Sequence, residues 1–419
     1  MNADTHIIQL QEHGELNDEQ IKTFNKLGVQ FCNTDYESAP LYLGIDPQSL
    51  RASYYIGAEW VSDSYAIVVT PKVTNLDFVE MFVNVLKFEP ASQYFSQFYG
   101  IDISGNPIKT DSFNSQITPL IIIHFIALLK KLTKRGLKKD YIIRHENLQS
   151  KIKGRIQISR HVKHNIASRR EDRIYCRYQE YTEDNPENRI LKKALAYAES
   201  YLNTFSSHKS FRTLSAILND LRIHFANVSD YIGTRQLKIS SYNKLYKEYS
   251  EALRMATMIL RRFNYSISET KSNQSYTPPF WIDMSRLYEV YVYSKLHERF
   301  GDSIKFQVQG HWKTAVDFVD CASHIIIDTK YKPQYDTSNS GMIDDIRQIS
   351  AYARDTLILR AMNHDNDTIP DCLIIYPDCA GDDCSTASSF NHIDNLLTHA
   401  TPITGFKQFY KLSVPLPRH

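Results

Sequence analysis

The spacing of apolar residues divides the chain into three regions. Residues 1–115 are rich in short β-like runs such as Ala66 to Val73, with one helix predicted over Leu76 to Leu86. Residues 116–275 carry long amphipathic stretches. These stretches predict helices over 119–132, 186–205, 210–225 and 242–263, interrupted by strands over 151–158 and 174–181. A polar segment ending in Pro278-Pro279 separates the third region, because helices rarely cross such a pair.

Residues 276–419 alternate between helical and strand patterns. A helix is predicted from the N-cap candidate Asp283 onward, followed by three strands, a second helix, and strands over 372–376 and 406–414. Strands that alternate with helices imply a mixed sheet with helices on its faces. The pattern therefore predicts an α+β multidomain protein: a β-rich and helical N-terminal region, then a C-terminal α/β domain with a mixed central sheet.

Two carboxylates are predicted to meet at the edge of that sheet. Ile325 to Ile327 are three consecutive β-branched residues of a buried strand, and Asp328 follows them directly. The preceding strand, Thr314 to Val319, carries Asp317, and a turn over 320–323 would pair the two strands as a hairpin. Charged oxygens at the end of a core strand need a partner or a cation. Two carboxylates at one edge suit Mg²⁺, with Mn²⁺ as an alternative.

Three further polar features accompany this pair. Lys330 follows Asp328 on the same strand face, where it would stabilise charge on a phosphate. Glu289 lies on the apolar arc of the helix that follows Asp283, either as a ligand of the metal or as an ion-pair partner of a neighbouring helix. A second helix places Asp345, Gln348 and Tyr352 on one face, which could equally be a solvated polar stripe. Asp320 is a rival for the first acid, but its position in the turn favours a solvated side chain.

This order of residues resembles the PD-(D/E)XK nuclease superfamily, in its branch with a QxxxY helix. The wider sequence resembles the McrC family, the nuclease subunit of McrBC-type modification-dependent restriction systems. The segments that carry this second resemblance are Tyr54 to Gly57, Ile67 to Val73, Arg135 to Tyr141, Ile152 to Ile156 and Cys176 to Lys192. One position departs from the superfamily pattern, since Val316 stands where a proline often precedes the first aspartate.

The resemblance implies a role for each candidate residue. Asp317, Asp328 and Glu289 would be metal ligands, Lys330 the catalytic lysine, and Gln348 with Tyr352 an accessory pair. It also implies a partner, a hexameric McrB-like AAA+ GTPase, which McrC docks on and stimulates. Residues 1–115 would be a docking domain, 116–275 a mainly helical middle region and 276–419 the endonuclease domain. In the family, the region before the nuclease domain enters the central opening of the ring.

Composition and charge agree with a DNA-cutting subunit. The net charge is only +2, but residues 130–173 hold 15 Lys or Arg against four acids. Such a cluster either binds the phosphates of double-stranded DNA or forms the solvated face of a helix. The P-loop pattern G-x-x-x-x-G-K-[ST] does not occur in the sequence, so no nucleotide should bind to this chain. The apolar run 117–129 is shorter than a membrane span, and no secretory signal is recognisable, so the expectation is a cytoplasmic protein without a membrane contact.

The predicted function is therefore a Mg²⁺-dependent endonuclease subunit of a GTP-driven restriction complex that acts on 5-methylcytosine-type modified DNA. It would also stimulate GTP hydrolysis by its partner. Two alternatives remain open at this level. One is a non-catalytic activator of an AAA+ ring that keeps a nuclease-like fold as a scaffold. The other is a stand-alone nuclease similar to RecB, which the long N-terminal region without helicase motifs disfavours.

Overall fold

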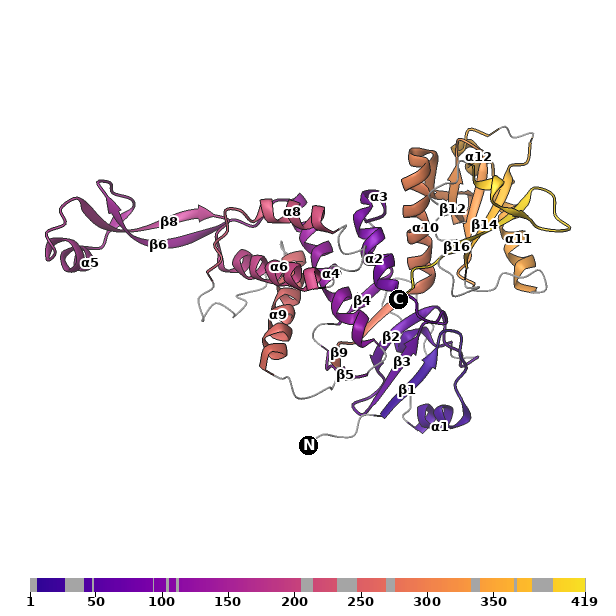
Figure 1. Ribbon diagram of the computed structural model, residues 1–419, viewed down its shortest axis with the longest axis horizontal. Coiled ribbons are helices and arrows are strands. Elements are labelled where there is room, and N and C mark those ends of the chain that lie inside the picture. Colours follow the sequence, from indigo (N-terminus) through magenta and orange to yellow (C-terminus); the bar gives the residue numbers. More distant parts are fainter. Residues whose placement is uncertain are drawn as a thin grey trace. The chain divides into compact units, whose positions relative to one another are not determined.

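The structure is a computed structural model that describes most of the 419 residues. The described ranges are 6–26, 41–46, 49–92, 94–102, 105–110, 113–204, 214–231, 247–268, 276–332, 340–364, 368–378 and 395–418. Parts of the predicted helices over 210–225 and 242–263, and of the polar segment before Pro278, lie outside these ranges. Contacts divide the chain into two compact units, one of Met1–Ile123 with Asn273–His419 and one of His124–Ser272 (Figure 1).

The first unit contains a five-stranded mixed sheet in the order β1-β3-β2-β10-β4. Its strands are β1 (His6–Gln11), β2 (Tyr55–Trp60), β3 (Tyr65–Thr70), β4 (Tyr99–Ile101) and β10 (Phe280–Asp283). Gly57 of β2 has φ +147°, and a Cβ there would lie 2.1 Å from the carbonyl oxygen of Phe280. Glycine therefore permits β10, from far along the chain, to enter this sheet. The contacts thus join the first and third regions of the sequence.

Short elements surround this sheet. Helix α1 (Asp18–Lys26) buries Phe24, and α2 (Phe78–Lys87) buries seven residues of its apolar face. The predicted helix over Leu76 to Leu86 is therefore confirmed, beginning two residues later after Asp77, whose side chain accepts a hydrogen bond from the backbone of Glu80. The remaining elements here are α3 (Glu89–Ser92), η1 (Leu41–Gly44), η2 (Phe95–Gln97) and the paired strands β5 (Ile108–Lys109) and β9 (Tyr276–Thr277).

A six-stranded mixed sheet in the order β11-β12-β13-β14-β16-β15 forms the rest of the first unit. The strands are β11 (Ile304–Gln309), β12 (Ala315–Asp320), β13 (Ile325–Thr329), β14 (Asp371–Asp378), β15 (Thr401–Pro402) and β16 (Phe409–Pro415). β13, β14 and β16 run parallel, while β11, β12 and β15 pair antiparallel to their neighbours. The predicted mixed sheet is present, and the overall α+β class is confirmed.

Helices cover this sheet because its strands are apolar on both faces. Tyr293 of α10 (Met284–Phe300) stacks on Phe306 and Phe318 of β11 and β12, with ring centroids 4.6 and 6.0 Å away. Residues of α11 (Ser340–Tyr352) and α12 (Thr356–Ala361) form a buried cluster with Val319 and Ile326. Ile325 to Ile327 are fully buried, as three successive β-branched residues predict. The short helices η5 (Gly301–Ser303), η6 (His311–Lys313) and η9 (Leu396–Thr398) lie in the connections.

The second unit combines helices with an exposed arm that contains a three-stranded sheet in the order β6-β8-β7. Its helices are α6 (Pro186–Thr204), α8 (Ser215–His224), α9 (Lys247–Ser268) and the C-terminal half of α4 (Asn114–Lys134). Strands β6 (Asp140–Gln149) and β8 (Arg173–Thr182) pair antiparallel over ten residues each, and β7 (Arg155–Ile156) joins β8 (Figure 1). Between β7 and β8 the chain forms α5 (Ile158–His161) and the π-helical turn η3 (Val162–Ile166).

The sequence described this arm only in part. The strand predicted over 174–181 is confirmed as β8, but the strand predicted over 151–158 is reduced to Arg155–Ile156 and gives way to a helix. Strand β6 was missed altogether. Its residues are nearly all exposed or half-buried, so neither face shows the apolar alternation that marks a strand packed on a core.

Helix α4 is longer than its apolar run suggests. Its segment Gln116–Lys134 is long and apolar enough to cross a membrane by length and composition alone. However, 67% of this window is buried inside the protein. Burial of that extent is typical of a core helix.

Three polar residues fix the base of the arm to α6. The side chain of Asn185 accepts a hydrogen bond from the backbone N–H of Asn188 at 2.9 Å. The side-chain amides of Asn185 and Asn188 both donate hydrogen bonds to the carbonyl oxygen of Lys138. Both asparagines therefore have a structural role at the base of the arm. Asp184 binds Arg189 of α6 at 2.6 Å and Arg144 of β6 at 3.1 Å. These contacts, the bond from Arg189 above all, hold the pKa of Asp184 well below its usual value.

Replacing Asp184 with Asn should therefore destabilise the chain by about 2 kcal/mol at pH 7, because two guanidinium groups lose their partner. The pKa is lowered in the folded state, so the stabilisation is complete above the usual Asp value of about 4 and is lost as the pH falls below it. Urea unfolding at pH 7 and pH 3 should show a gap between variant and wild type that shrinks at pH 3. Asp230, which pairs with Lys192 but is 87% exposed, provides the matched control: Asp230→Asn should change little.

Candidate functional site

The β12–β13 hairpin brings the two predicted acids together. Phe318 pairs with Ile327 and Val319 with Ile326, so one further step of this register sets Asp317 opposite Asp328. Oδ2 of Asp317 accepts hydrogen bonds from the backbone N–H of Thr329 at 2.7 Å and from its hydroxyl at 2.6 Å. Asp317 is therefore held from across the hairpin, at the end of the strand that carries Asp328.

Lys330 connects the acids to the second helix. Its Nζ lies 2.6 Å from Oδ2 of Asp328 and donates to Oε1 of Gln348 at 3.0 Å. Gln348 donates in turn to the hydroxyl of Tyr352 at 2.9 Å, one turn further along α11. The backbone N–H of Lys330 donates to Ile375 of β14 at 2.8 Å, which anchors the residue to the neighbouring strand. Four predicted residues, Asp328, Lys330, Gln348 and Tyr352, are thus connected by successive polar contacts from β13 to α11, and this series is called the polar chain below.

Glu289 projects from α10 toward the same acids. The carboxylate is buried and accepts from Arg286 at 2.5 Å and from Gln307 of β11 at 3.1 Å. The ion pair is therefore formed within its own helix rather than with a neighbouring one. Glu289 is also close enough to Asp317 for the negative charge of that residue to raise its pKa.

Burial and mutual repulsion shape the electrostatics of the three acids. Burial raises the pKa of Glu289 to about 8, with the charge of Asp317 adding to the effect and Arg286 opposing it. Burial and Asp317 likewise raise the pKa of Asp328 to about 7, against the pull of Lys330. The pKa of Asp317 is raised by burial in spite of its bonds from Thr329. Burial alone would lower the pKa of Lys330, but the surrounding carboxylates, Asp328 first, raise it.

The acids fit a hard divalent cation in their chemistry. Carboxylate oxygens are the donors that Mg²⁺ prefers, and a cation would relieve the repulsion that raises the pKa values of the acids. The described residues contain no group of three His, Cys, Asp or Glu side chains already arranged around one metal position. Instead, the ammonium of Lys330 lies against Asp328, and Arg286 lies against Glu289. These cations partly neutralise the site, so a metal would require their side chains to move.

Several residues of this site were missed by sequence reasoning. Thr329, Arg286 and Gln307 hold the acids, and only Arg286, three residues before Glu289 on one helix, had a spacing that could have suggested it. Asp345 of α11 was placed on the correct face, where it pairs with Lys332 at 2.7 Å and lies 3.8 Å from Lys330.

The five-stranded sheet also contacts the segment after Lys330. Nζ of Lys72 donates to the carbonyl of Tyr331 at 2.6 Å, and the backbone N–H of Lys72 donates to the buried Glu12 at 3.0 Å. Lys72 and Tyr331 are separated by 259 positions, so no local pattern could reveal their contact.

The expectation for Asp320 was wrong. This residue is the last of β12 rather than part of an exposed turn, and only 1% of its surface is accessible. Its Oδ1 accepts from the backbone of Ala322 at 3.0 Å, so the side chain caps the hairpin turn from inside. Burial makes Asp320 a structural residue of the hairpin.

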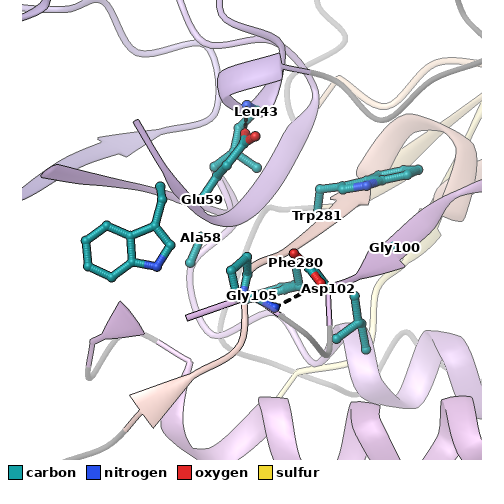
Figure 2. Close-up of a pocket in the computed structure, with 11 residues that line it drawn as sticks. Leu43, Ala58, Glu59, Gly100, Asp102, Gly105, Phe280 and Trp281 are labelled. Atoms are coloured by element: carbon teal, nitrogen blue, oxygen red, sulfur yellow. Dashed lines mark hydrogen bonds between the residues drawn. The ribbon is translucent and has the colours of Figure 1, made fainter. Parts of the chain in front are cut away.

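A separate pocket lies in the five-stranded sheet. It has a volume of about 570 Å³ and is lined by residues of β2, β4 and β10, among them Trp60, Trp281 and Glu59, and by Asp102 directly after β4 (Figure 2). Glu59 accepts from the backbone of Leu43, and Asp102 accepts from Gly105. None of the acids of the hairpin lines this pocket, so the pocket and the acid cluster are distinct features.

Comparison with known proteins identifies the family. A family model described as McrBC 5-methylcytosine restriction system component matches residues 50–377, more than half of the chain. The chain is 15% identical to a solved structure of Thermococcus gammatolerans McrB AAA+ hexamers with bound McrC, with 98% of this chain and 94% of that chain covered and a TM-score of 0.38. It is 16% identical to the Thermococcus gammatolerans McrBC complex, with 69% and 87% covered and a TM-score of 0.29. The comparison with curated proteins gives no match. The chain belongs to the family of McrBC 5-methylcytosine restriction system components.

Proposed function

We propose that this chain is the Mg²⁺-dependent endonuclease subunit of a GTP-driven restriction complex that acts on DNA carrying 5-methylcytosine-type modifications. The observation that carries the proposal is the polar chain Asp328–Lys330–Gln348–Tyr352 beside Asp317. An acid pair, a lysine two residues after the second acid and a QxxxY helix are the features of a PD-(D/E)XK nuclease. The hairpin, the parallel strands β13 and β14 and the flanking helices support that fold for residues 276–419.

Each residue has a task that its position permits. Asp317 and Asp328, with Glu289 from α10, would hold Mg²⁺ or Mn²⁺, which supplies a Lewis acid and an activated water when bound. Lys330 is anchored by its backbone to β14 and by its side chain to Gln348, so its charge is fixed where negative charge would develop on the scissile phosphate. Tyr352 orients Gln348 through its hydroxyl. The protein would bind double-stranded DNA by contacting the phosphate backbone of the DNA, and a partner would recognise the bases.

The partner we propose is a McrB-like AAA+ GTPase hexamer, which the chain would stimulate, and the compartment is the cytoplasm. The exposed arm of the second unit supports a docking role. Among the described residues, half of the large apolar side chains with strong exposure lie between 141 and 181. Ile158, Val162 and Ile166 share one helix face at the tip by i, i+4 and i+8 spacing, and are 72%, 46% and 58% exposed. An exposed apolar row of this kind marks a contact with another protein.

The tip is held in shape before any partner binds. Asn165 lies in the π-helical turn at the tip and is fully buried. Its amide exchanges two hydrogen bonds of 2.8 Å with Asn147 of β6 and donates to the carbonyl of Arg173 at 3.0 Å. Little conformational entropy would be lost when such a tip enters an opening in a ring. The predicted docking of residues 1–115 stays a proposal beside that of the arm.

Charge at the tip favours an anionic environment. At the base of the arm, Lys138, Lys139 and Arg144 are paired with acids of the same unit. Toward the tip, the exposed basic residues are Lys151, Lys153, Arg155, Arg160, Lys163, Arg169 and Arg170. The basic cluster of the sequence is therefore divided between a paired base and an exposed tip, with only Lys130 to Arg135 at the end of α4.

Reconstitution tests the proposal. The purified chain is combined with its AAA+ partner, GTP and Mg²⁺, and is given methylated or unmethylated plasmid. We expect cleavage of the methylated plasmid alone, and no cleavage when GTP or Mg²⁺ is omitted. Stimulated GTP hydrolysis without cleavage under any of these conditions would instead support the non-catalytic activator.

A further inference from the structure

Trp312 is the most exposed large apolar residue that the structure describes. It is 95% accessible, whereas the other two tryptophans of the sequence, Trp60 and Trp281, are half-buried and line the pocket of the five-stranded sheet. Complete exposure of an indole is unfavourable in water, and such residues commonly serve to bind another molecule.

The loop that presents this side chain is rigid. It connects β11 to β12, and its ends are joined by a hydrogen bond from Gly310 to the carbonyl of Thr314 at 2.8 Å. The carboxylate of Asp355 accepts from the backbone N–H of His311 at 2.7 Å and lies 2.8 Å from its ring. Within the loop, the hydroxyl of Thr314 donates a hydrogen bond to the carbonyl oxygen of His311 at 2.7 Å. The exposure of Trp312 is thus built into the fold.

The backbone at this loop is strained. Trp312 and Lys313 have φ values of 59° and 61°, in the left-handed region that favours glycine. A bulky residue costs of order 1 kcal/mol there. Glycine at position 312 would remove that cost, so the tryptophan lowers the local stability of the loop.

The loop lies at the same edge of the sheet as the acids. Asp317 is the third residue of β12, so it lies roughly 7 Å along the strand from the end of the loop. On the other side, Asp355 follows α11, only three residues after Tyr352 of the polar chain. A DNA strand placed over Asp317 and Asp328 would therefore reach Trp312 within a few nucleotides.

The charges near the loop favour a polyanion. Lys313 is adjacent to Trp312, and Arg354 is exposed next to the anchoring Asp355. His311, which is 48% exposed, is paired with Asp355, so this acid is already engaged. An aromatic face beside cations is the combination that binds single strands by stacking a base while the backbone is held.

We propose that Trp312 stacks on a base that is unpaired in the DNA strand presented for cleavage, close to the scissile phosphate. This inference rests on the proposed nuclease function. A rigid, strained loop that exposes an indole at the acid-bearing edge of the sheet has no role in the core of this unit. Stacking of one base contributes about 1–3 kcal/mol, which corresponds to roughly 5- to 150-fold in affinity.

Binding and fluorescence test the proposal together. The complex with the AAA+ partner is titrated onto labelled DNA with Ca²⁺ in place of Mg²⁺. Trp312→Gly should weaken binding at least 5-fold while its thermal unfolding midpoint stays equal or rises, whereas Trp312→Phe should keep most of the affinity. DNA should quench tryptophan fluorescence in the wild type, and this quenching should be lost in Trp312→Phe. Phe406→Ala, at an exposed ring of another loop, is the matched control.

The outcomes separate this inference from the proposed function. If the wild-type complex cuts DNA but Trp312→Gly binds DNA as tightly as the wild type, the stacking inference falls and the nuclease assignment stands. If Trp312→Gly instead loses stimulation of GTP hydrolysis with unchanged DNA binding, the side chain contacts the protein partner and the inference is overturned. If the wild-type complex neither binds nor cuts DNA, both proposals fail.

Discussion

Asp328→Asn should lower the rate of DNA cleavage by on the order of 10³-fold and leave the stimulation of GTP hydrolysis unchanged. The asparagine keeps the shape of the buried side chain but cannot supply an anionic oxygen to a metal. It also removes the partner that holds Lys330 at 2.6 Å. The measurement is plasmid cleavage in the presence of the AAA+ partner, with GTP hydrolysis followed in the same samples.

Two further variants make this result specific. Lys330→Met should lose cleavage to a similar extent, because it leaves the acids in place but removes the fixed positive charge. Asp344→Asn is the matched control, since Asp344 lies on α11 one residue before Asp345 but is exposed and paired with Arg347. Cleavage by Asp328→Asn at the wild-type rate would refute the assignment of these residues and leave the scaffold function as the remaining candidate.

Replacing Ile158, Val162 and Ile166 together with Ser should abolish stimulation of GTP hydrolysis at partner concentrations that saturate the wild type. The three side chains are exposed in the isolated chain, so the substitutions cost the fold little. If each contributes about 1 kcal/mol when buried against the ring, the loss of about 3 kcal/mol weakens binding by about 150-fold. Analytical ultracentrifugation with the AAA+ partner and GTP turnover measure the two effects.

Ile223 supplies the control for the arm. It is 72% exposed, like Ile158, but lies on α8 in the helical part of the same unit. Ile223→Ser should retain partner binding and stimulation. Full stimulation by the triple variant would show that the apolar row at the tip is not the contact, and would leave residues 1–115 as the candidate docking region.

Helices and strands that bury one face, or that are buried on all sides, were predictable from the sequence. Ile325 to Ile327, the helix after Asp283 and the amphipathic α6 each follow a local rule, whether apolar runs, an N-cap or helical spacing. The arm strand β6 was not predictable, because nearly all of its residues are exposed or half-buried and show no apolar alternation. The tip helix α5 was not predictable, because it has only four residues and none of them is buried. The entry of β10 into the N-terminal sheet depends on Gly57 and on a partner more than 200 residues away.

The sequence by itself determined the family of this protein and the residues that are candidates for its chemistry. Asp317, Asp328, Lys330, Gln348 and Tyr352 were identifiable from residue type and spacing, and the family followed from motifs along the chain. The tertiary structure decided how these groups are held: the bonds from Thr329 to Asp317, from Gln307 to Glu289 and from Lys72 to Tyr331 all cross between separate elements. It also decided that Asp320 is buried and that Trp312 is exposed. Residue type and local period specify a side chain and its face, but burial and hydrogen-bond partners arise only when distant strands and helices pack together.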